Sequence, residues 1–261
     1  CPWAHRTLIY RKLKGLEDHI SISVVNPLML SNGWTFEPAD GVITDPIDGF
    51  DKLHQVYTAA DPDYTGRVTV PILWDRETAT VVNNESSEII RMFDREFDGV
   101  GEGGPLFCPR ELEEEIDSVN AFVYPKINNG VYKAGFATTQ AAYEEAVVEL
   151  FDALDTLEER LGGHRYLIGD RLTEADWRLF TTLLRFDPVY VGHFKCNIRR
   201  LVDYPNLWGY TRDLYQTPGV ADTVHMDHIK DHYYRSHETI NPSGVVPAGP
   251  VVDFTEPHGR D

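Results

Sequence analysis

The chain reads Cys1-Pro2-Trp3-Ala4-His5-Arg6 over its first six residues, and this hexapeptide is the most informative feature of the sequence. Proline is favoured at the first position of a helix, because the N–H group that it lacks would have no partner there. Cys1 would then be the N-cap, facing unpaired backbone N–H groups and the positive end of the helix dipole. Such surroundings lower the pKa of a thiol, so the motif predicts a reactive thiolate. A buried, inert cysteine at an ordinary helix start is the alternative.

The other cysteines offer Cys1 no resolving partner. A Cys-x-x-Cys redox motif would carry its second cysteine where this chain has Ala4, so a mixed disulfide on Cys1 must be released by a small external thiol. Cys1, Cys108 and Cys196 are odd in number and widely spaced, which predicts neither a disulfide framework nor a metal-ligand cluster. A lone reactive thiol suits a reducing cytoplasm.

Composition and charge exclude several classes of function. The 261 residues are enough for one large or two ordinary domains, and 42% hydrophobic and 25% charged residues are typical of soluble globular proteins. The formal net charge of −18 opposes nucleic-acid binding, which needs clustered lysine and arginine. No apolar run reaches the ~18 residues of a membrane span, so we expect no membrane partner. The acidic surplus fits either a salty cytoplasm or an ordinary acidic enzyme.

The first hundred residues predict a mixed α/β domain. Helical and alternating apolar spacings give the order helix 2–15, strand 20–25, irregular segment 26–50, helix 51–60, strands 68–74 and 81–82, and helix 85–97. Helix, strand, hairpin and helix, with a cysteine at the first helix start, is the thioredoxin-like order. The strand that should precede Cys1 is missing from it.

Beyond a glycine-rich segment at 99–105, the sequence pattern becomes helical. Amphipathic spacing predicts helices at 109–127, 139–161, 206–216 and 218–233, and the residues from Thr173 to Asp176 have the spacing of a capping box. A tail rich in proline and glycine should be extended. We therefore expect a thioredoxin-like domain at 1–98, a linker at 99–108, an all-α domain at 109–240 and an extended tail at 241–261.

The chain resembles the glutathionyl-hydroquinone reductases, the Xi class of the glutathione transferase superfamily, along nearly all of its length. Besides the first six residues, the resemblance rests on Asn32-Gly33-Trp34, Val70-Pro71-Ile72-Leu73, Asn84-Glu85-Ser86, Asn129-Gly130-Val131-Tyr132, His193-Phe194-Lys195-Cys196, Tyr204-Pro205-Asn206-Leu207-Trp208 and Glu256-Pro257-His258-Gly259-Arg260-Asp261. It implies an all-α transferase-type domain after the thioredoxin-like one, a first strand and N-terminal segment upstream of Cys1, a homodimer, and glutathione as co-substrate.

Val70-Pro71 is the second strong signal. In thioredoxin-like folds, the residue before a cis-proline lies beside the catalytic thiol, and its backbone N–H and C=O groups pair with a bound cysteinyl peptide. We therefore predict a cis bond before Pro71. A trans-proline at a strand edge is the alternative.

Glu85-Ser86 and Trp34 are the other candidates for glutathione binding. The γ-glutamyl end of glutathione carries a carboxylate and an ammonium, and a helix that opens on Glu85-Ser86 can take both. The residues alone leave a plain N-cap at Asn84 equally open. The resemblance favours the glutathione site, because Glu85, Ser86 and Trp34 match glutathione contacts of the family. As a bare feature, Trp34 could equally pack the segment 26–50 against the fold.

Three tyrosines are candidates for the aromatic substrate. Tyr132 and Tyr233 match tyrosines that the family places over the substrate, and Tyr190 is a weaker candidate of the same kind. A phenol can hydrogen-bond a hydroquinone oxygen, and its ring can stack on the substrate. Without the resemblance, each would be interpreted as a core or surface aromatic residue.

A group of histidines also has helical spacing. Its members are His225, His228 and His232. Carboxylates are interspersed and no cysteine is near, so we interpret the group as a solvated helix face and expect no metal.

These features predict glutathione-dependent reduction of glutathionyl-hydroquinones. Cys1 would attack the sulfur of a glutathione–aromatic thioether, and a second glutathione would release the mixed disulfide as oxidised glutathione. The aromatic leaving group is what the resemblance implies. Two alternatives stay open: an Omega- or glutaredoxin-like thiol transferase that needs no tyrosines, and a non-catalytic interaction module whose thiol pKa is the ordinary value of about 8.5. In a halophilic host, another γ-glutamyl thiol could replace glutathione.

Overall fold

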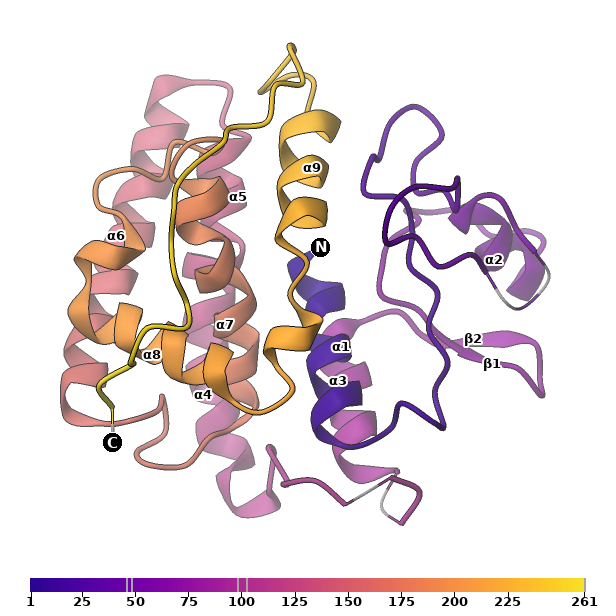
Figure 1. The fold of residues 1–261 in the computed structure, drawn as a ribbon, viewed down its shortest axis with the longest axis horizontal. Coiled ribbons are helices and arrows are strands. Elements are labelled where there is room, and N and C mark those ends of the chain that lie inside the picture. The colour runs from indigo at the N-terminus through magenta and orange to yellow at the C-terminus, as the bar shows by residue number, and fades with distance from the viewer. Residues whose placement is uncertain (46, 48, 98, 102, 261) are drawn as a thin grey trace.

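The computed structural model describes residues 1–45, 47, 49–97, 99–101 and 103–260. Its first part contains α1 (Pro2–Leu13), α2 (Leu53–Ala60), β1 (Leu73–Asp75), β2 (Thr80–Asn83) and α3 (Ser86–Arg95). Figure 1 shows α2 and the β1–β2 hairpin on one side of α1 and α3, with the helices of the second part on the other side. Apart from the strand expected at 20–25, the order of elements is the thioredoxin-like one that the sequence predicts.

Helix α1 joins the two parts. Cys1 is its N-cap and Pro2 its first residue, as predicted. The helix ends at Leu13, and Gly15 follows with a φ of +62°, a left-handed conformation that favours glycine. Ile9 and Tyr10 are fully buried, because α1 packs against both α3 and α7 (Glu174–Arg185).

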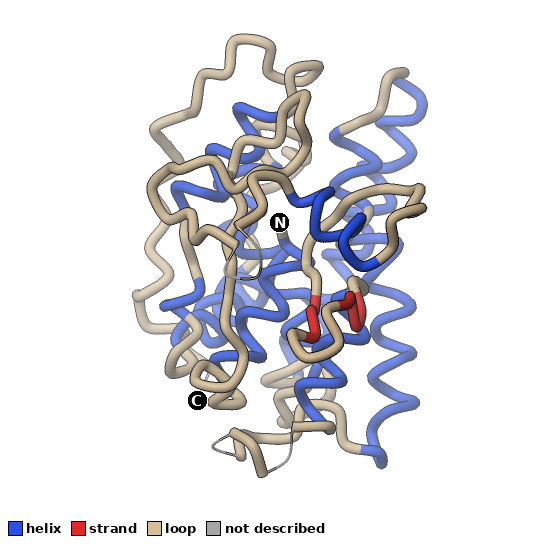
Figure 2. The backbone as a smooth tube through the Cα atoms, turned by 90° about the vertical axis from the view of Figure 1, so that its right-hand side faces the viewer, coloured by secondary structure: helices blue, strands red, loops and turns tan. Residues whose placement is uncertain are grey.

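The strands β1 and β2 form an antiparallel hairpin, in which Trp74 lies opposite Val81. Figure 2 shows these two short strands among loop segments. The strand expected at 68–74 is therefore shorter than predicted and shifted to Leu73–Asp75, whereas the strand expected at 81–82 forms within β2.

The strand expected at 20–25 is a wrong prediction. Within that segment only Val24 pairs, in an isolated bridge with Ile43. A strand needs a neighbour to satisfy its N–H and C=O groups, and no strand of the described residues runs beside this one. Its alternating apolar side chains instead line a cavity.

The second part is helical, as expected. Its α-helices are α4 (Glu113–Val123), α5 (Gly130–Gly135), α6 (Gln140–Gly163), α7 (Glu174–Arg185), α8 (Pro205–Gln216) and α9 (Met226–Ser236). Short 3₁₀ turns lie at Arg110–Leu112, Leu201–Asp203 and Ala221–Thr223, and π-helical turns lie at Tyr124–Asn128 and Phe186–Tyr190. Helix α7 is the central helix, because nearly every one of its residues is buried.

Two expected helices are divided in the structure. The segment at 109–127 ends in the π-helical turn that contains Pro125, a residue that cannot donate a helical hydrogen bond. The helix expected at 218–233 begins at Met226, after the 3₁₀ turn Ala221–Thr223. The capping box forms as predicted: the Thr173 N–H donates to the Asp176 carboxylate at 2.8 Å.

The tail after residue 240 is extended, as predicted, and runs along the helical part (Figure 1). The Gln216 amide donates to the carbonyls of Phe254 and Glu256 at 2.8 and 2.7 Å. Arg260 donates to the carbonyls of Leu161 and His164 at 3.1 and 2.6 Å, and so caps the end of α6. None of the described helices has the length and apolarity needed to cross a membrane.

Candidate functional site

Cys1 lies at the junction of the two parts. Its side chain is partly exposed, and its Sγ donates to the backbone oxygen of Val70 at 3.7 Å. The peptide bond between Val70 and Pro71 is cis, as predicted. The thiol therefore lies both at a helix start and beside an extended backbone segment that could pair with a bound cysteinyl peptide.

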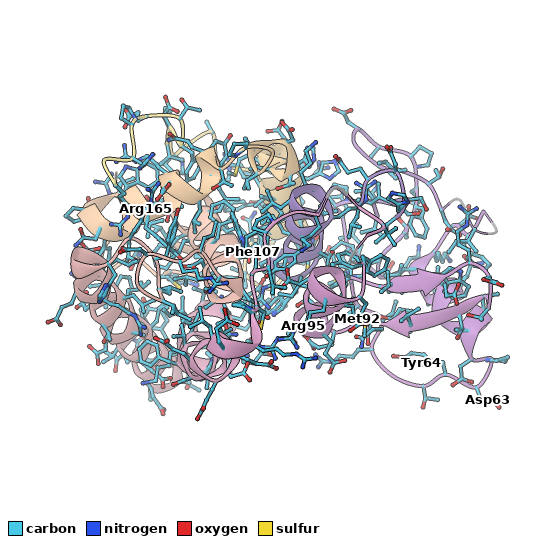
Figure 3. All side chains as sticks on the ribbon, turned by 90° about the horizontal axis from the view of Figure 1, so that it is seen from below. Asp63, Tyr64, Met92, Arg95, Phe107 and Arg165 are labelled. Carbon is cyan, nitrogen blue, oxygen red and sulfur yellow. The ribbon has the colours of Figure 1, made fainter. Side chains whose placement is uncertain are left out.

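A cavity of about 870 Å³ opens beside Cys1, between the thioredoxin-like part and α9. Of the predicted site residues, its wall includes Cys1, Trp34, Val70 and Pro71. Met92 of α3 also lines it. Figure 3 shows Met92 toward the hairpin and Arg95, one turn later, toward Phe107 and the helical part. Helix α3 therefore has one face on the cavity and the other on the domain interface.

Trp34 and the histidines of α9 meet across this cavity. Trp34 is 8% exposed and stacks on His232 with ring centroids 4.8 Å apart. His232 Nδ1 lies 2.9 Å from the backbone oxygen of Pro27, and His228 Nε2 contacts that of Asp40. The solvated helix face is therefore a wrong interpretation for His228 and His232, which contact the segment 26–50, whereas His225 is exposed.

Metal binding has no support in the part of the chain that the structure describes: no group of three or more histidine, cysteine, aspartate or glutamate side chains there could hold an ion.

Glu85 and Ser86 begin α3, with Glu85 as the N-cap. The exposed Glu85 carboxylate accepts from the Ser87 N–H at 3.3 Å. Ser86 is buried, and its hydroxyl accepts from Arg6 Nη1 at 3.3 Å. Asn84 is not the N-cap, since its amide donates to the Tyr57 hydroxyl at 3.1 Å instead. The start of α3 thus presents an exposed carboxylate, with the arginine buried beneath it.

The three predicted tyrosines meet in one group, the tyrosine cluster (Tyr132, Tyr190 and Tyr233). The Tyr233 hydroxyl lies 2.5 Å from that of Tyr132 and 2.9 Å from that of Tyr190. They come from α5, the turn Phe186–Tyr190 and α9. Burial raises the pKa of all three phenols, which keeps them protonated at neutral pH.

The tyrosine cluster does not line the cavity beside Cys1. It is connected to the thiol through Trp3, two residues after Cys1 on the chain, whose ring centroid lies 5.1 Å from that of Tyr132. Cys1 therefore contacts Val70 at the cavity wall, and the tyrosine cluster packs against Trp3 of the same helix start.

Sequence reasoning missed a buried hydrogen-bond chain behind Cys1. Arg185 Nη1 lies 3.2 Å from His5 Nδ1, and His5 Nε2 lies 2.9 Å from the Thr223 hydroxyl. A guanidinium can only donate, so Nδ1 accepts and the imidazole proton is on Nε2. Burial, reinforced by the Arg185 charge, lowers the pKa of His5 well below its ordinary value. His5 is therefore neutral, and it cannot act as the base for Cys1 because Nδ1 already accepts from Arg185 and Nε2 carries the proton.

The remaining cysteines are unreactive. Cys108 and Cys196 are buried. Burial raises the pKa of the Cys108 thiol to about 11 and that of the Cys196 thiol to about 12. Of the three cysteines, Cys1 is therefore the one whose thiol is partly exposed.

A histidine pair beside the tyrosine cluster should make stability depend on pH. His193 Nε2 lies 3.0 Å from His237 Nδ1, and burial lowers the pKa of each to about 4, with the charge of Lys195 assisting at His193. The unfolded chain takes up these protons near pH 6.5, whereas the folded chain does so near pH 4. The contribution of the two histidines to the free energy of unfolding is therefore fully present above pH 6.5. It is lost as the pH falls toward 4, by roughly 2 kcal/mol for each histidine.

Urea unfolding at a series of pH values checks this expectation. The double variant His193→Gln, His237→Gln should show a flatter decline of unfolding free energy below pH 6.5 than the unchanged protein. His19→Gln, at an exposed position, is the matched control and should keep the original slope. Equal slopes in all three proteins would contradict the assignment.

Comparisons with known proteins agree with this geometry. Residues 1–96 match the family "Glutathione S-transferase, N-terminal domain", and residues 140–213 match "Glutathione S-transferase, C-terminal domain". The chain is 59% identical to the glutathionyl-hydroquinone reductase YqjG of Escherichia coli, over 100% of this chain and 80% of that protein. It is 60% identical to the glutathionyl-hydroquinone reductase PcpF of Sphingobium chlorophenolicum, over 96% of this chain and 80% of that one.

Solved structures give the same assignment. The glutathione-bound structure of the Escherichia coli protein matches with a TM-score of 0.98, over 100% of this chain and 85% of that chain. The Xi-class glutathione transferase of Natrialba magadii is 54% identical and matches with a TM-score of 0.98, over 100% of this chain and 80% of that chain. The chain therefore belongs to the glutathione transferase family and, within it, to the Xi class of glutathionyl-hydroquinone reductases.

Proposed function

We propose that the protein reduces glutathionyl-hydroquinones to hydroquinones with glutathione as the reductant, through a mixed disulfide on Cys1. The observation that carries the proposal is a partly exposed monothiol, Cys1, at a helix start and in contact with the Val70 carbonyl. Trp3 of the same helix packs against a hydrogen-bonded tyrosine cluster. The names of the Escherichia coli and Sphingobium chlorophenolicum relatives, both glutathionyl-hydroquinone reductases, support the substrate class.

The first half-reaction forms the mixed disulfide. The substrate ring is first protonated at the carbon that bears sulfur, as one hydroquinone hydroxyl becomes a carbonyl. The Cys1 thiolate then attacks the glutathione sulfur, the new S–S bond forms, and the carbon–sulfur bond breaks. The electron pair of that bond passes to the carbonyl oxygen, giving a hydroquinone oxyanion that takes a proton from the tyrosine cluster. The substrate is thereby reduced and the two sulfurs are oxidised.

The second half-reaction restores the thiolate. A glutathione thiolate attacks the glutathione sulfur of the mixed disulfide, and oxidised glutathione leaves with Cys1 as the leaving group. No second protein thiol is needed, which agrees with Ala4 at the fourth position of the motif and with the burial of Cys108 and Cys196.

Glutathione would lie along the cavity wall beside Cys1. The backbone of Val70, held by Pro71, would pair with the cysteinyl part, and Trp34 would cover the tripeptide. At the start of α3, the Glu85 carboxylate would bind the ammonium, and the backbone N–H groups near Ser86 would take the carboxylate. The buried charge of Arg6, which donates to Ser86, favours a carboxylate there.

The assembly and cellular setting follow from the family likeness. We assign the thioredoxin-like, glutathione-binding domain to 1–98, the linker to 99–108, the helical domain to 109–240 and the tail to 241–261. We further propose a homodimer that acts on glutathionylated aromatic substrates in the cytoplasm. A host with another γ-glutamyl thiol would use that thiol in place of glutathione.

Replacing Tyr132 and Tyr233 with phenylalanine tests the reaction type. The double variant should lose roughly 10²-fold in hydroquinone release, because proton transfer to the leaving group contributes about this much. It should retain disulfide exchange with a small glutathione disulfide, which needs Cys1 but no phenol. Both rates are measured by oxidised-glutathione formation.

Tyr143→Phe is the matched control, since its hydroxyl binds the Lys195 carbonyl outside the cluster, and it should leave both rates unchanged. If the double variant also retains full hydroquinone release, the tyrosine roles are wrong and an Omega-like thiol transferase is favoured. If Cys1 reacts with iodoacetamide with an ordinary thiol pH profile, near pH 8.5, the non-catalytic module is favoured.

A further inference from the structure

Arg185 is a buried arginine on the wall of the cavity beside Cys1. It is the last residue of α7 and is 2% exposed. The helix continues directly into the turn Phe186–Tyr190, so that Tyr190 of the cluster follows five residues later. Arg185 therefore borders both the cavity and the element that carries one of the phenols.

Some N–H groups of the Arg185 guanidinium have no hydrogen-bond acceptor among the described residues. Within the described residues, only Nη1 forms hydrogen bonds, with the Nδ1 of His5 at 3.2 Å and the backbone oxygen of Thr181 at 2.7 Å. Nε is buried without a partner in the described part of the chain. A buried donor without an acceptor is unfavourable, so a bound acceptor at this place would be stabilised.

Its charge also lacks a protein counter-ion. Among the described residues, no carboxylate lies within ion-pair distance of Arg185, whereas Arg91 and Arg178 both pair with the buried Glu174. A buried cation is normally paired. The positive charge acts on all three phenols of the tyrosine cluster, where it opposes the rise in pKa that burial causes. The missing anion is therefore expected where the phenols meet the substrate.

We propose that Arg185 is a catalytic residue that stabilises the hydroquinone oxyanion as the carbon–sulfur bond breaks. This inference rests on the proposed function. In that step the electron pair passes to the hydroquinone oxygen, and the free Nε and Nη2 groups of Arg185 donate to the oxyanion until the tyrosine cluster protonates it. His5 is a positioning residue: its neutral Nδ1 holds Nη1 and adds no competing negative charge.

The kinetic test uses Arg185→Gln and Arg185→Lys in the full chain. For the glutamine variant we expect a 10²–10³-fold loss in hydroquinone release, the size found when an oxyanion donor is removed. The loss should be smaller for a chlorinated ring, whose oxyanion is intrinsically more stable. Exchange with a small glutathione disulfide, which creates no oxyanion on carbon-bound oxygen, should be retained. Lysine keeps the charge and should restore part of the rate.

A binding test separates the role of Arg185 from the proposed function. The chromophore 4-nitrophenol changes absorbance when it ionises, and the protein should lower the pKa of the bound probe. In Arg185→Gln the bound probe should ionise about one pH unit higher than in the unchanged protein. If the unchanged protein releases no hydroquinone but shows this difference, the proposed function fails while the anion site stands.

Two results would overturn the inference. One is an unchanged ionisation of bound 4-nitrophenol in Arg185→Gln, or in Arg185→Met if the glutamine variant does not fold. The other is an equal loss of hydroquinone release and disulfide exchange with a shifted pH profile of Cys1 alkylation, which would make Arg185 a partner of the thiolate. Arg212→Gln, which removes an arginine bound to Glu256 outside the cavity, is the control and should leave every readout unchanged.

Discussion

Replacing Cys1 with serine should abolish hydroquinone release, with a loss in turnover of about 10⁴-fold or more, as when other enzymes lose their nucleophile. A serine hydroxyl is not ionised at neutral pH, and the neighbouring His5 cannot take its proton because Nδ1 already accepts from Arg185. Serine is also a favoured N-cap, so α1 should persist. Steady-state assays should therefore show the loss while urea unfolding changes by less than about 0.5 kcal/mol.

The same substitution tests the covalent intermediate. After exposure to a glutathionyl-hydroquinone without free glutathione, mass spectrometry should show one added glutathione on Cys1 and none on Cys1→Ser. Cys108→Ala and Cys196→Ala serve as controls and should keep the adduct, because burial raises the pKa of both thiols to about 11 and about 12. A glutathione adduct on the serine variant would contradict the assignment, as would turnover by a protein that never carries one.

The parts of the fold that sequence predicted are those with local signals. Pro2 after Cys1 marked the start of α1, the capping box at Thr173 marked α7, and the proline-rich tail was correctly taken as extended. Each signal depends on a few neighbouring residues and their own backbone. The local structure that it predicts is therefore the same whatever the rest of the fold. The cis bond before Pro71 was predicted through the thioredoxin-like context and is confirmed.

The parts that sequence could not predict depend on distant partners. The alternating residues at 20–25 have strand character, yet a strand forms only if another strand runs beside it. The histidines of α9 look like a solvated face until the segment 26–50 packs on them, as the stack of Trp34 on His232 shows. The spacing of residues in the sequence shows which of them share one face of a helix. It does not show which other segment of the chain packs against that face.

The candidate site divides in the same way. Cys1 and Val70 could be predicted because each belongs to a short sequence motif, Cys-Pro-Trp-Ala and Val-Pro. The structure places the two residues in contact. Arg185 carries no such signal: it is one arginine at the end of an apolar helix, and its proposed role rests on burial with no carboxylate partner in the described part of the chain. Such a residue can be recognised only when the packing around it is known.

One buried carboxylate makes several of the polar contacts at the domain interface. Glu174 at the start of α7 is fully buried. It accepts from Arg91 of α3 at 2.7 Å, from Asn120 of α4 at 3.1 Å and from Arg178 of its own helix at 3.2 Å. One side chain thus joins the thioredoxin-like part to two helices of the second part.

Replacing Glu174 with glutamine should cost about 3–5 kcal/mol of unfolding free energy, because it breaks a buried ion pair and removes the carboxylate that Arg178 binds. Arg91 would keep its ion pairs with Glu113 and Asp117. Urea unfolding followed by fluorescence and by circular dichroism measures the loss. The matched control is Glu113→Gln, which breaks a more exposed ion pair with Arg95 in the same interface and should cost less than about 1 kcal/mol. Equal losses in the two variants would mean that burial of Glu174 adds nothing. The Cys1 active site would then depend on apolar packing of α1 against α7 rather than on this carboxylate.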